Sequence, residues 1–372
     1  MIRHFGQRFQ SHHLAASQLC TGGLAAALLL ACAALDGHAS AQNFPARSVK
    51  IVVPYPISGP TDIRGTSRVT KTYKLVAMHA PLPISDTLAS MVAQAIGAGS
   101  RHPVVLERLP GGVTSRGATA VAQSPADGHT LLLAGNATMV INPYYFHGIK
   151  YDPVRDFVLI APIATMPFVL VVNSGVPVDT PSSLVEWLRV RPGEINFSSS
   201  GDGSVGHLAG QLFQRMTGIN AVHVSYNGGM AALNGLATGQ VSLMFAALPL
   251  ALPYLTNRHF RPLGIAGRRR FELLPGLATL AESGLPDFEV EAWFGIYGPA
   301  RVPPAAVVWL NEQIVAYIAQ DAVRSQLLAL GLDPATGTLA QFATRIHSET
   351  ERWVPVIRES RTPGRDRSPG QG

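Results

Sequence analysis

Short apolar runs alternate with longer amphipathic stretches along the chain from residue 49 onward. The runs that we predict to be strands are Val49–Val53, Val104–Glu107, Thr130–Ala134, Phe168–Val172, Ile195–Ser199, Ala221–Val224, Val241–Phe245 and Pro262–Ala266. They are rich in β-branched and aromatic residues, whereas the stretches between them have a helical period. This alternation is typical of an α/β fold, in which mainly parallel sheets are covered by helices on both faces.

Two of the amphipathic stretches carry the clearest helical period. In the first, apolar residues recur three and four positions apart at Val205, Leu208, Ala209, Leu212, Phe213 and Met216. The second follows Pro303-Pro304, where proline suits a helix start because the first N–H groups need no intrahelical partner. Its apolar residues are Val308, Leu310, Ile314 and Ile318. We predict that both helices bury one face against a sheet.

The first 41 residues have a different pattern. Basic Arg3 and Arg8 precede an apolar stretch from Leu24 to Leu35, and Ala39-Ser40-Ala41 offers a cleavage site with small residues. This is the layout of a signal peptide, and its apolar part is shorter than the roughly 20 residues that a membrane-spanning helix needs. We therefore predict that residues 1–41 are a signal peptide and that the mature protein is periplasmic.

Both cysteines of the sequence, Cys20 and Cys32, lie in this segment. Cleavage after Ala41 leaves a chain that needs neither a disulfide nor a thiolate metal site. An alternative is that Leu29-Leu30-Ala31-Cys32 is a lipobox, which would make Cys32 a lipidated N-terminus. We favour cleavage after Ala41, because Leu30 is unusual at its place in a lipobox.

Composition and charge exclude some classes of function. With 372 residues, 47% of them hydrophobic, the chain can bury two ordinary cores, and two lobes are expected. The formal charge of +6 falls by one when the signal peptide is removed, and this mild excess suits an anionic ligand. Nucleic-acid binding would need a basic face with motif support, which the sequence lacks.

Two segments interrupt the regular pattern. Residues 65–85 separate Thr61-Asp62 from the helix that should follow directly, and we interpret them as an insertion. The final residues contain Pro, Gly, Arg and Asp with few apolar residues, so we expect 357–372 to form a disordered tail.

The most informative turn follows the strand that ends at Ser199. Ser199 and Ser200 lead into Gly201-Asp202-Gly203-Ser204, directly before the first predicted helix. Free N–H groups at a helix start, together with the helix dipole, favour an anion, and the serine hydroxyls add donors. The same residue types also cap helices without binding anything, so both interpretations stay open here.

This turn also matches the pattern G-x-G-x-x-G of dinucleotide-binding proteins. That motif expects an acidic residue after the next strand, to hold the ribose hydroxyls. Here Ala221–Val224 is followed by Ser225-Tyr226-Asn227-Gly228-Gly229, which contains no carboxylate. We therefore disfavour a nicotinamide enzyme and predict no cofactor.

Further polar turns follow other strands, at Pro54–Asp62, Gly135–Thr138 and Tyr226–Gly228. In open α/β sheets, ligands bind beyond the carboxyl ends of the strands, so these turns can converge on one cleft. Each turn by itself is equally typical of ordinary turn chemistry.

Catalytic constellations are sparse in comparison. The sequence has no G-x-S-x-G or H-E-x-x-H motif, and its histidines do not pair at metal-ligand spacing. We interpret His207 and His223 as structural. Asp202 and Ser204 could form a base and a nucleophile, but nothing in the sequence supplies the rest of a triad. We predict that the protein is not an enzyme and holds no metal.

The residues resemble those of one family, the tripartite tricarboxylate transporter receptors, also called Bug proteins. The similar pieces run in the family's order from about residue 44 to 355. They are Val53-Pro54-Tyr55-Pro56 with Gly59-Pro60-Thr61-Asp62, Val104–Glu107 with Pro110-Gly111-Gly112, Ala126–Leu132, Asn142-Pro143, Tyr151–Phe157, Ser204–Gly210, His223–Tyr226, Gly239-Gln240-Val241 with Met244-Phe245, Glu282–Pro286, and Trp293-Phe294-Gly295 with Pro299-Ala300.

The resemblance implies a two-lobed periplasmic binding protein of the flytrap-like type II, each lobe a mainly parallel sheet flanked by helices, with crossing strands between the lobes. It implies lobe 1 at 42–165 and 268–356, lobe 2 at 166–267, and a small carboxylate gripped by two loops. The ligand-binding residues would be Ser58, Gly59, Thr61, Asp62, Asn136, Thr138, Ser199, Ser200, Gly203, Ser204, Tyr226, Asn227 and Ala246. The implied partners are membrane permease subunits, and we expect a monomer.

The sequence departs from the family's pattern in three places. Ala246 stands where the family usually has an acidic residue, which favours a plain or aromatic carboxylate over an amino acid. The insertion at 65–85 follows a ligand loop, so either Ser58–Asp62 still forms that part of the site or Ser85-Asp86-Thr87 has become the helix start. The tail after Arg358 lacks the family's usual ending. Alternatives to a transport receptor are a ligand-binding module for a sensor partner and a receptor-like protein with an impaired site.

Overall fold

The structure is a computed structural model that describes residues 44–55, 83–255, 260–335 and 337–360. The signal peptide, the loop with Ser58, Gly59, Thr61 and Asp62, nearly all of the insertion and the end of the tail lie outside these residues. The predicted start of the disordered tail at residue 357 was wrong, because a helix continues to Glu359 and Ile357 is fully buried. The chain forms two compact units, residues 1–46 and 47–372, and all the described strands and helices belong to the second.

The strands of this unit form one ten-stranded sheet. The strands are β1 (Val49–Val53), β2 (Val104–Arg108), β3 (Thr130–Gly135), β4 (Phe157–Asn173), β5 (Asn196–Ser199), β6 (Val222–Ser225), β7 (Leu243–Ala247), β8 (Phe260–Ile265), β9 (Glu291–Pro299) and β10 (Asp333–Pro334). Their order is β2-β1-β3-β9-β4-β7-β5-β6, and β8 and β10 also pair with β4.

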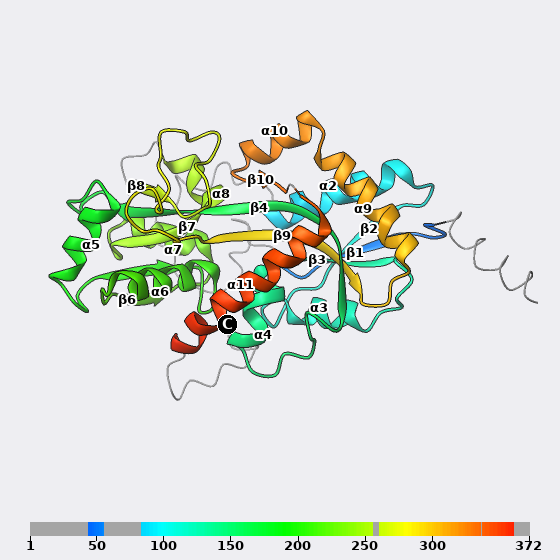
Figure 1. Cartoon of the computed structure of the whole chain (residues 1–372), viewed down its shortest axis with the longest axis horizontal. Helices are drawn as coiled ribbons and strands as arrows, with labels where there is room; N and C mark the ends of the chain where they lie inside the picture. Colours follow the sequence, from blue (N-terminus) through cyan, green and yellow to red (C-terminus); the bar gives the residue numbers. More distant parts are fainter. Residues whose placement is uncertain (1–43, 56–82, 256–259, 336, 361–372) are drawn as a thin grey trace, which may run out of the picture. The chain divides into compact units, whose positions relative to one another are not determined.

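Strand β4 divides this sheet into two halves (Figure 1). Its residues Phe157–Pro167 pair with β9, and Phe168–Asn173 pair with β7 and β8. In the first half β1 is parallel to β2 and β3, and in the second β5 is parallel to β6 and β7. The parallel strands of each half are joined to β4 by antiparallel pairs, directly for β7 and through β9 for β3, so the sheet is mixed and β4 runs through both halves. The lobe boundaries in the sequence stay a prediction.

The register of the strands places the carboxyl ends of β3 and β7 near the same segment of β4. Gly135, the last residue of β3, lies opposite Phe294 of β9, which in turn lies opposite Ala164 of β4. Ala247, the last residue of β7, lies opposite Phe168 of β4. Since β3 and β7 run in opposite directions along β4, their carboxyl ends point toward each other across this short segment.

All the predicted strands are present, but β4 is longer than predicted, and β9 and the two-residue β10 were missed. The prediction placed the start of β4 at Phe168, but the strand begins at Phe157 and contains Pro162 and Pro167, although proline is usually confined to strand ends, edges and bulges. Irregular register next to Pro162 accommodates the proline. In β9, Gly295 is a poor strand former, yet it allows a close approach to the carbonyl oxygen of Ala161, which would lie 3.1 Å from an added Cβ.

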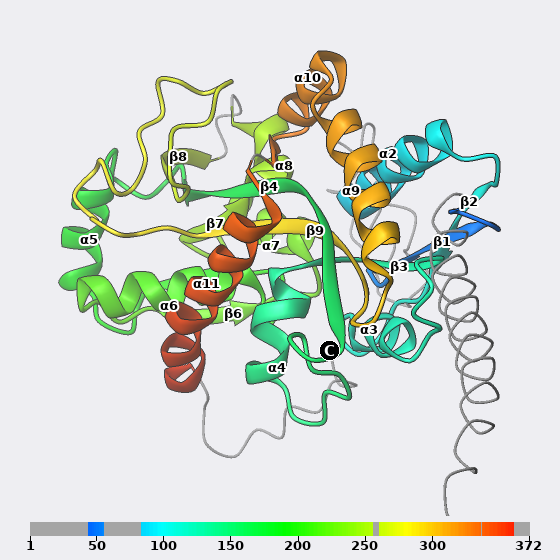
Figure 2. The same cartoon turned by 45° about the vertical axis from the view of Figure 1, so that its right-hand side comes forward.

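Helices cover both halves of the sheet. They are α2 (Ile84–Gly99), α3 (Ser115–Ala122), η4 (Ala137–Ile141), α4 (Asn142–Tyr145), α5 (Pro181–Arg189), α6 (Val205–Thr217), α7 (Gly229–Ala237), α8 (Leu248–Ala251), η5 (Leu252–Tyr254), α9 (Pro304–Ile318), α10 (Asp321–Ala329) and α11 (Leu339–Glu359). Helix α9 lies beside α2, as Figures 1 and 2 show. No helix in the described part of the chain is long and apolar enough to cross a membrane.

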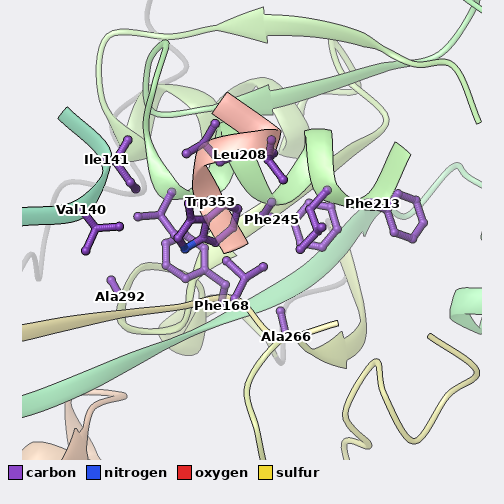
Figure 3. Packing of buried hydrophobic residues seen from close by; sticks show 14 of the residues in the cluster. Val140, Ile141, Phe168, Leu208, Phe213, Phe245, Ala266, Ala292 and Trp353 are labelled. Carbon is purple, nitrogen blue, oxygen red and sulfur yellow. The ribbon is translucent and has the colours of Figure 1, made fainter. Parts of the chain in front are cut away.

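The two helices predicted from their apolar stripes are α6 and α9. Most stripe residues are buried, but Met216 at the end of α6 is 39% exposed and Val308 of α9 is 55% exposed. These two predictions were wrong, because Met216 lies in the last turn of α6 and Val308 lies on a different side of α9 from Leu310, Ile314 and Ile318. The core continues from α6 onto other elements, where Leu208 and Phe245 pack with Phe168 and Trp353 (Figure 3).

Candidate functional site

The end of β3 holds two predicted site residues, and both are buried. Asn136 is 1% exposed, and its Nδ2 donates a hydrogen bond of 2.9 Å to the carbonyl oxygen of Glu291 on β9. Thr138 is fully buried, with its hydroxyl 2.8 Å from that of Thr114. The carbonyl oxygen of Thr138 accepts from the Tyr151 hydroxyl at 2.6 Å. Both residues are therefore held firmly at the crossing of the two halves.

The ends of β1 and β2 add residues that the sequence analysis did not propose. Tyr55 follows β1 and packs edge-on against Phe294, and burial raises the pKa of Tyr55 to about 12. Asp86, in the first turn of α2, is 5% exposed and pairs with Arg108 at 2.5 Å. Its Oδ2 has no hydrogen-bond partner among the described residues. In the sequence, this pair was indicated only by the position of Arg108 directly after the predicted strand Val104–Glu107.

Ser85, Asp86 and Thr87 lie in the first turn of α2, as one of the two alternatives for the insertion predicts. The other alternative concerns Ser58, Gly59, Thr61 and Asp62, which lie outside the described residues. The choice between the two therefore stays a prediction.

The turn from β5 into α6 holds the predicted Ser/Gly residues. Ser199 is fully buried; its hydroxyl donates to the carbonyl oxygen of Gly201 at 3.0 Å and accepts from the N–H of Gly201 at 3.2 Å. Ser204 caps α6, because its hydroxyl accepts from the N–H of His207 at 3.3 Å. Gly203 has a φ of +75° and lies against Tyr145, whose ring would be 2.7 Å from an added Cβ. Glycine is therefore required there.

Two histidines that the sequence analysis interpreted as structural pack behind this turn. The rings of His207 and His223 stack with centroids 3.9 Å apart. Nε2 of His223 is 2.7 Å from the Ser199 hydroxyl, and its Nδ1 is 3.5 Å from a carboxylate oxygen of Asp202. The signal for the contact was the pairing of β5 with β6, which aligns Ser199 with Ser225 and so places His223 two residues earlier on the same face.

Ser199, His223 and Asp202 contact one another in the order of a hydrolase triad, whereas the sequence analysis considered Asp202 with Ser204 as base and nucleophile. The Ser199 side chain is fully buried and bonds within its own turn. A nucleophile must instead face a substrate and nearby oxyanion donors. The arrangement therefore suits the support of the turn rather than catalysis.

Donor atoms of Asp202, His207 and His223 lie within 4.8 Å of one another, so we tested whether they fit a metal ion. The N–H of Gly203 donates to Nδ1 of His207 at 3.1 Å, which occupies one lone pair. The stacked rings, only 16° from parallel, direct their in-plane lone pairs side by side rather than toward one point. The cluster thus fits a packed hydrogen-bonded support better than a shared metal ion.

The remaining predicted residues differ in exposure. Ser200 and Asn227 are exposed, and the hydroxyl of the half-buried Tyr226 donates to Gln240 at 3.4 Å. Ala246 is fully buried on β7, opposite Val169, in an apolar cluster. None of these positions establishes a contact with a ligand, so the predicted ligand-binding residues stay a prediction.

A surface cavity of about 370 Å³ lies among other residues than the predicted ligand-binding ones. Its wall is formed by Pro143, Tyr144, Phe146, His147, Gly148, Ile149, Tyr151, Val354 and Arg358. None of the predicted polar turns lines this cavity. We therefore place the candidate site at the carboxyl ends of the strands instead.

Known proteins resemble the chain over most of its length. Residues 88–361 match the profile of the "Tripartite tricarboxylate transporter family receptor". Protein BugT of Bordetella pertussis is 29% identical over 334 residues, which are 90% of this chain and 95% of BugT.

Two solved structures are similar in fold as well as in sequence. R. palustris Rpa4515 with adipate is 29% identical with a TM-score of 0.70, and the match covers 85% of this chain and 97% of that one. MatC (Rpa3494) from Rhodopseudomonas palustris with bound malate is 27% identical with a TM-score of 0.67, and the match covers 84% of this chain and 100% of that one. The family and the fold are those of solute-binding receptors, and the chain belongs to the tripartite tricarboxylate transporter receptor family, or Bug proteins.

Proposed function

We propose that this protein is a periplasmic solute receptor that binds a small carboxylate and delivers it to membrane permease subunits. The observation that carries the proposal is the strand register: the turns after β3 and β7 meet across the same short segment of β4. The relatives with adipate and malate support a carboxylate as the ligand class. Delivery to a permease is what the family description supports.

The groups near these turns suit reversible binding of an anion. Hydroxyl, amide and backbone N–H donors can hold a carboxylate without a fixed countercharge. The Arg108–Asp86 pair is electrically balanced, so it adds a polar group at the same edge without trapping an anion. Alanine at 246 supplies no partner for a ligand amino group, which favours dicarboxylates, tricarboxylates or aromatic acids over amino acids.

The test is a thermal-shift screen of the exported protein, followed by calorimetry, with adipate, malate, citrate, benzoate, glutamate and galactose. A ligand at 100 times its Kd should add about 2.7 kcal/mol of stability. We expect a shift with one carboxylate class and none with galactose. Tight binding of galactose without a response to any carboxylate would contradict the proposal.

A matched pair of variants tests the place of the site. Asn136→Asp puts a negative charge at the end of β3, where it repels a bound carboxylate, and should weaken binding at least tenfold, or about 1.4 kcal/mol. Asn196→Asp is the control, because Asn196 lies at the opposite end of β5 and its amide also donates to a backbone carbonyl, at 3.2 Å. Equal weakening by both variants would contradict a site at the strand ends.

A further inference from the structure

Helix α11 is tied to the crossing strands by a buried network of charged side chains. Arg345 of α11 contacts the carboxylate of Glu349 at 2.9 Å and that of Glu291 at 2.7 Å. Its third nitrogen donates to the hydroxyl of Thr165 on β4 at 3.3 Å. One guanidinium therefore joins α11 to both β4 and β9, the two strands at the crossing.

The network is almost closed to water. The side chains of Glu291, Glu349 and Arg345 are 7%, 2% and 16% exposed. The remaining carboxylate oxygens also have donors, from Trp293 Nε1 to Glu349 at 2.9 Å and from the N–H of Arg268 to Glu291 at 3.1 Å. Because contacts rather than solvent satisfy these charges, the side chains have little freedom to rearrange.

The network touches the candidate site through Glu291. The carbonyl oxygen of this residue accepts the hydrogen bond from Asn136, while its carboxylate pairs with Arg345. Glu291 lies opposite Pro167 on β4, within the segment where the turns of the two halves meet. Glu291 is thus the single residue through which a change at Arg345 can affect Asn136.

The rest of α11 contacts the helical segment that follows each candidate turn. Trp353 packs in the cluster with Val140 of η4, which follows Asn136, and with Leu208 of α6, which follows Ser204 (Figure 3). Near its end, α11 also pairs with α6 through Glu359 and Arg215 at 3.1 Å. The helix therefore spans from the first half of the sheet to the second on one side of the crossing.

We infer that Arg345 is a positioning residue for the binding cleft. By fixing α11 on β4 and β9, it sets how the turn after β3 faces the turn before α6. The consequence for ligand affinity rests on the proposed function, but the consequence for the arrangement of the two halves does not require a ligand.

The first test needs no ligand. In the exported protein, from which cleavage after Ala41 would remove Cys20 and Cys32, spin labels are attached to cysteines placed at the exposed positions Gln123 and Val190, one in each half. Pulsed EPR then measures the distance distribution. We expect Arg345→Met and Glu349→Gln to broaden or shift it. Glu351→Gln is the matched control, since this carboxylate on the same helix is 70% exposed, and it should leave the distribution unchanged.

The second test measures adipate and malate binding to the same variants by calorimetry and stopped flow. We expect Arg345→Met and Glu349→Gln to raise Kd at least tenfold with faster dissociation, Arg345→Lys to recover part of the loss, and Glu351→Gln to bind as the wild type does. If Arg345→Met does not fold, Glu349→Gln decides, because glutamine keeps the shape of the side chain and an acceptor for Trp293.

The outcomes separate this inference from the proposed function. Variants that are less stable but keep the wild-type distance distribution and Kd would make the network purely structural and overturn the inference. If the wild type binds neither adipate nor malate while Arg345→Met shifts the distances, the inference stands and the proposed ligand class loses its support.

Discussion

Two clusters of polar side chains support the candidate site, and they are built in different ways. The turn cluster joins neutral or partly exposed groups around the start of α6: Ser199, Asp202, His207 and His223. The crossing cluster joins buried charges between α11 and the crossing strands: Thr165, Glu291, Trp293, Arg345 and Glu349. The turn cluster is mostly local in sequence, whereas the crossing cluster joins residues that are far apart.

The difference suggests a division of tasks. In the turn cluster the carboxylate of Asp202 is partly exposed and can exchange partners with water at low cost, although Ser199 and His207 are buried. Buried charges cannot, because losing a partner leaves a charge without solvent. We therefore expect changes in the crossing cluster to lower the free energy of unfolding most. Changes in the turn cluster should have a larger effect on binding in proportion to their effect on stability.

The largest effect should come from Arg345→Met. This change leaves Glu291 and Glu349 buried without their cation, and breaking such a network costs about 3–5 kcal/mol. Urea unfolding followed by circular dichroism measures it. The control is Arg155→Met, since Arg155 forms an exposed pair with Asp156 and its removal should change little. Equal effects of the two variants would mean that the crossing cluster is no more important than a surface pair.

Gly203→Ala tests the turn cluster by steric means. The left-handed conformation at φ +75° costs a residue with a Cβ about 1–2 kcal/mol, and the contact with Tyr145 should add about 1–3 kcal/mol. Gly218→Ala is the matched control, because Gly218 has a φ of +69° but nothing lies within 4 Å of its added Cβ. The loss of unfolding free energy in Gly203→Ala minus that in Gly218→Ala gives the cost of the contact with Tyr145. Equal losses would show that the Tyr145 ring moves away without cost.

The contrast between the clusters also explains what the sequence could predict. The ends of β1, β3, β5 and β6, and the capped start of α6, follow from local patterns of apolar runs and Ser/Gly turns. His223 could have been placed beside Ser199 from the pairing of neighbouring parallel strands. The turn cluster could thus have been predicted from the sequence, although the sequence analysis did not place the two structural histidines beside the turn.

No comparable local pattern in the sequence indicated the crossing cluster. In the sequence, Arg345 and Glu349 look like an ordinary exposed pair four residues apart on a helix. Only the contact with Glu291 shows that the pair is buried, and Glu291 begins β9, a strand that was not predicted. Long-range packing decides burial here, and a single sequence does not reveal it.

Ser204→Ala distinguishes a helix cap from an anion site, the two interpretations that the sequence left open. Loss of the cap should cost about 1 kcal/mol of stability. Thr338→Ala is the control, because Thr338 caps α11 in the same way, by accepting from a backbone N–H at 3.2 Å. We expect similar losses of stability in urea unfolding, but weaker binding of the responding carboxylate in calorimetry only for Ser204→Ala. Equal affinities would assign Ser204 to capping alone.

The smallest effect on stability should be the change in its pH dependence that Glu349→Gln produces. Burial raises the pKa of Glu349 above its ordinary value of 4.5, although Arg345 opposes the shift. The folded state therefore holds this proton more tightly than the unfolded state, so the contribution of Glu349 to stability falls as the pH rises from about 4.5 through the raised pKa. Glutamine does not titrate, and the stability of the wild type minus that of the variant should decline over this window. Urea midpoints between about pH 4 and 7 measure the decline, and a difference that instead rises with pH would show that Arg345 outweighs burial and that the pKa is lowered.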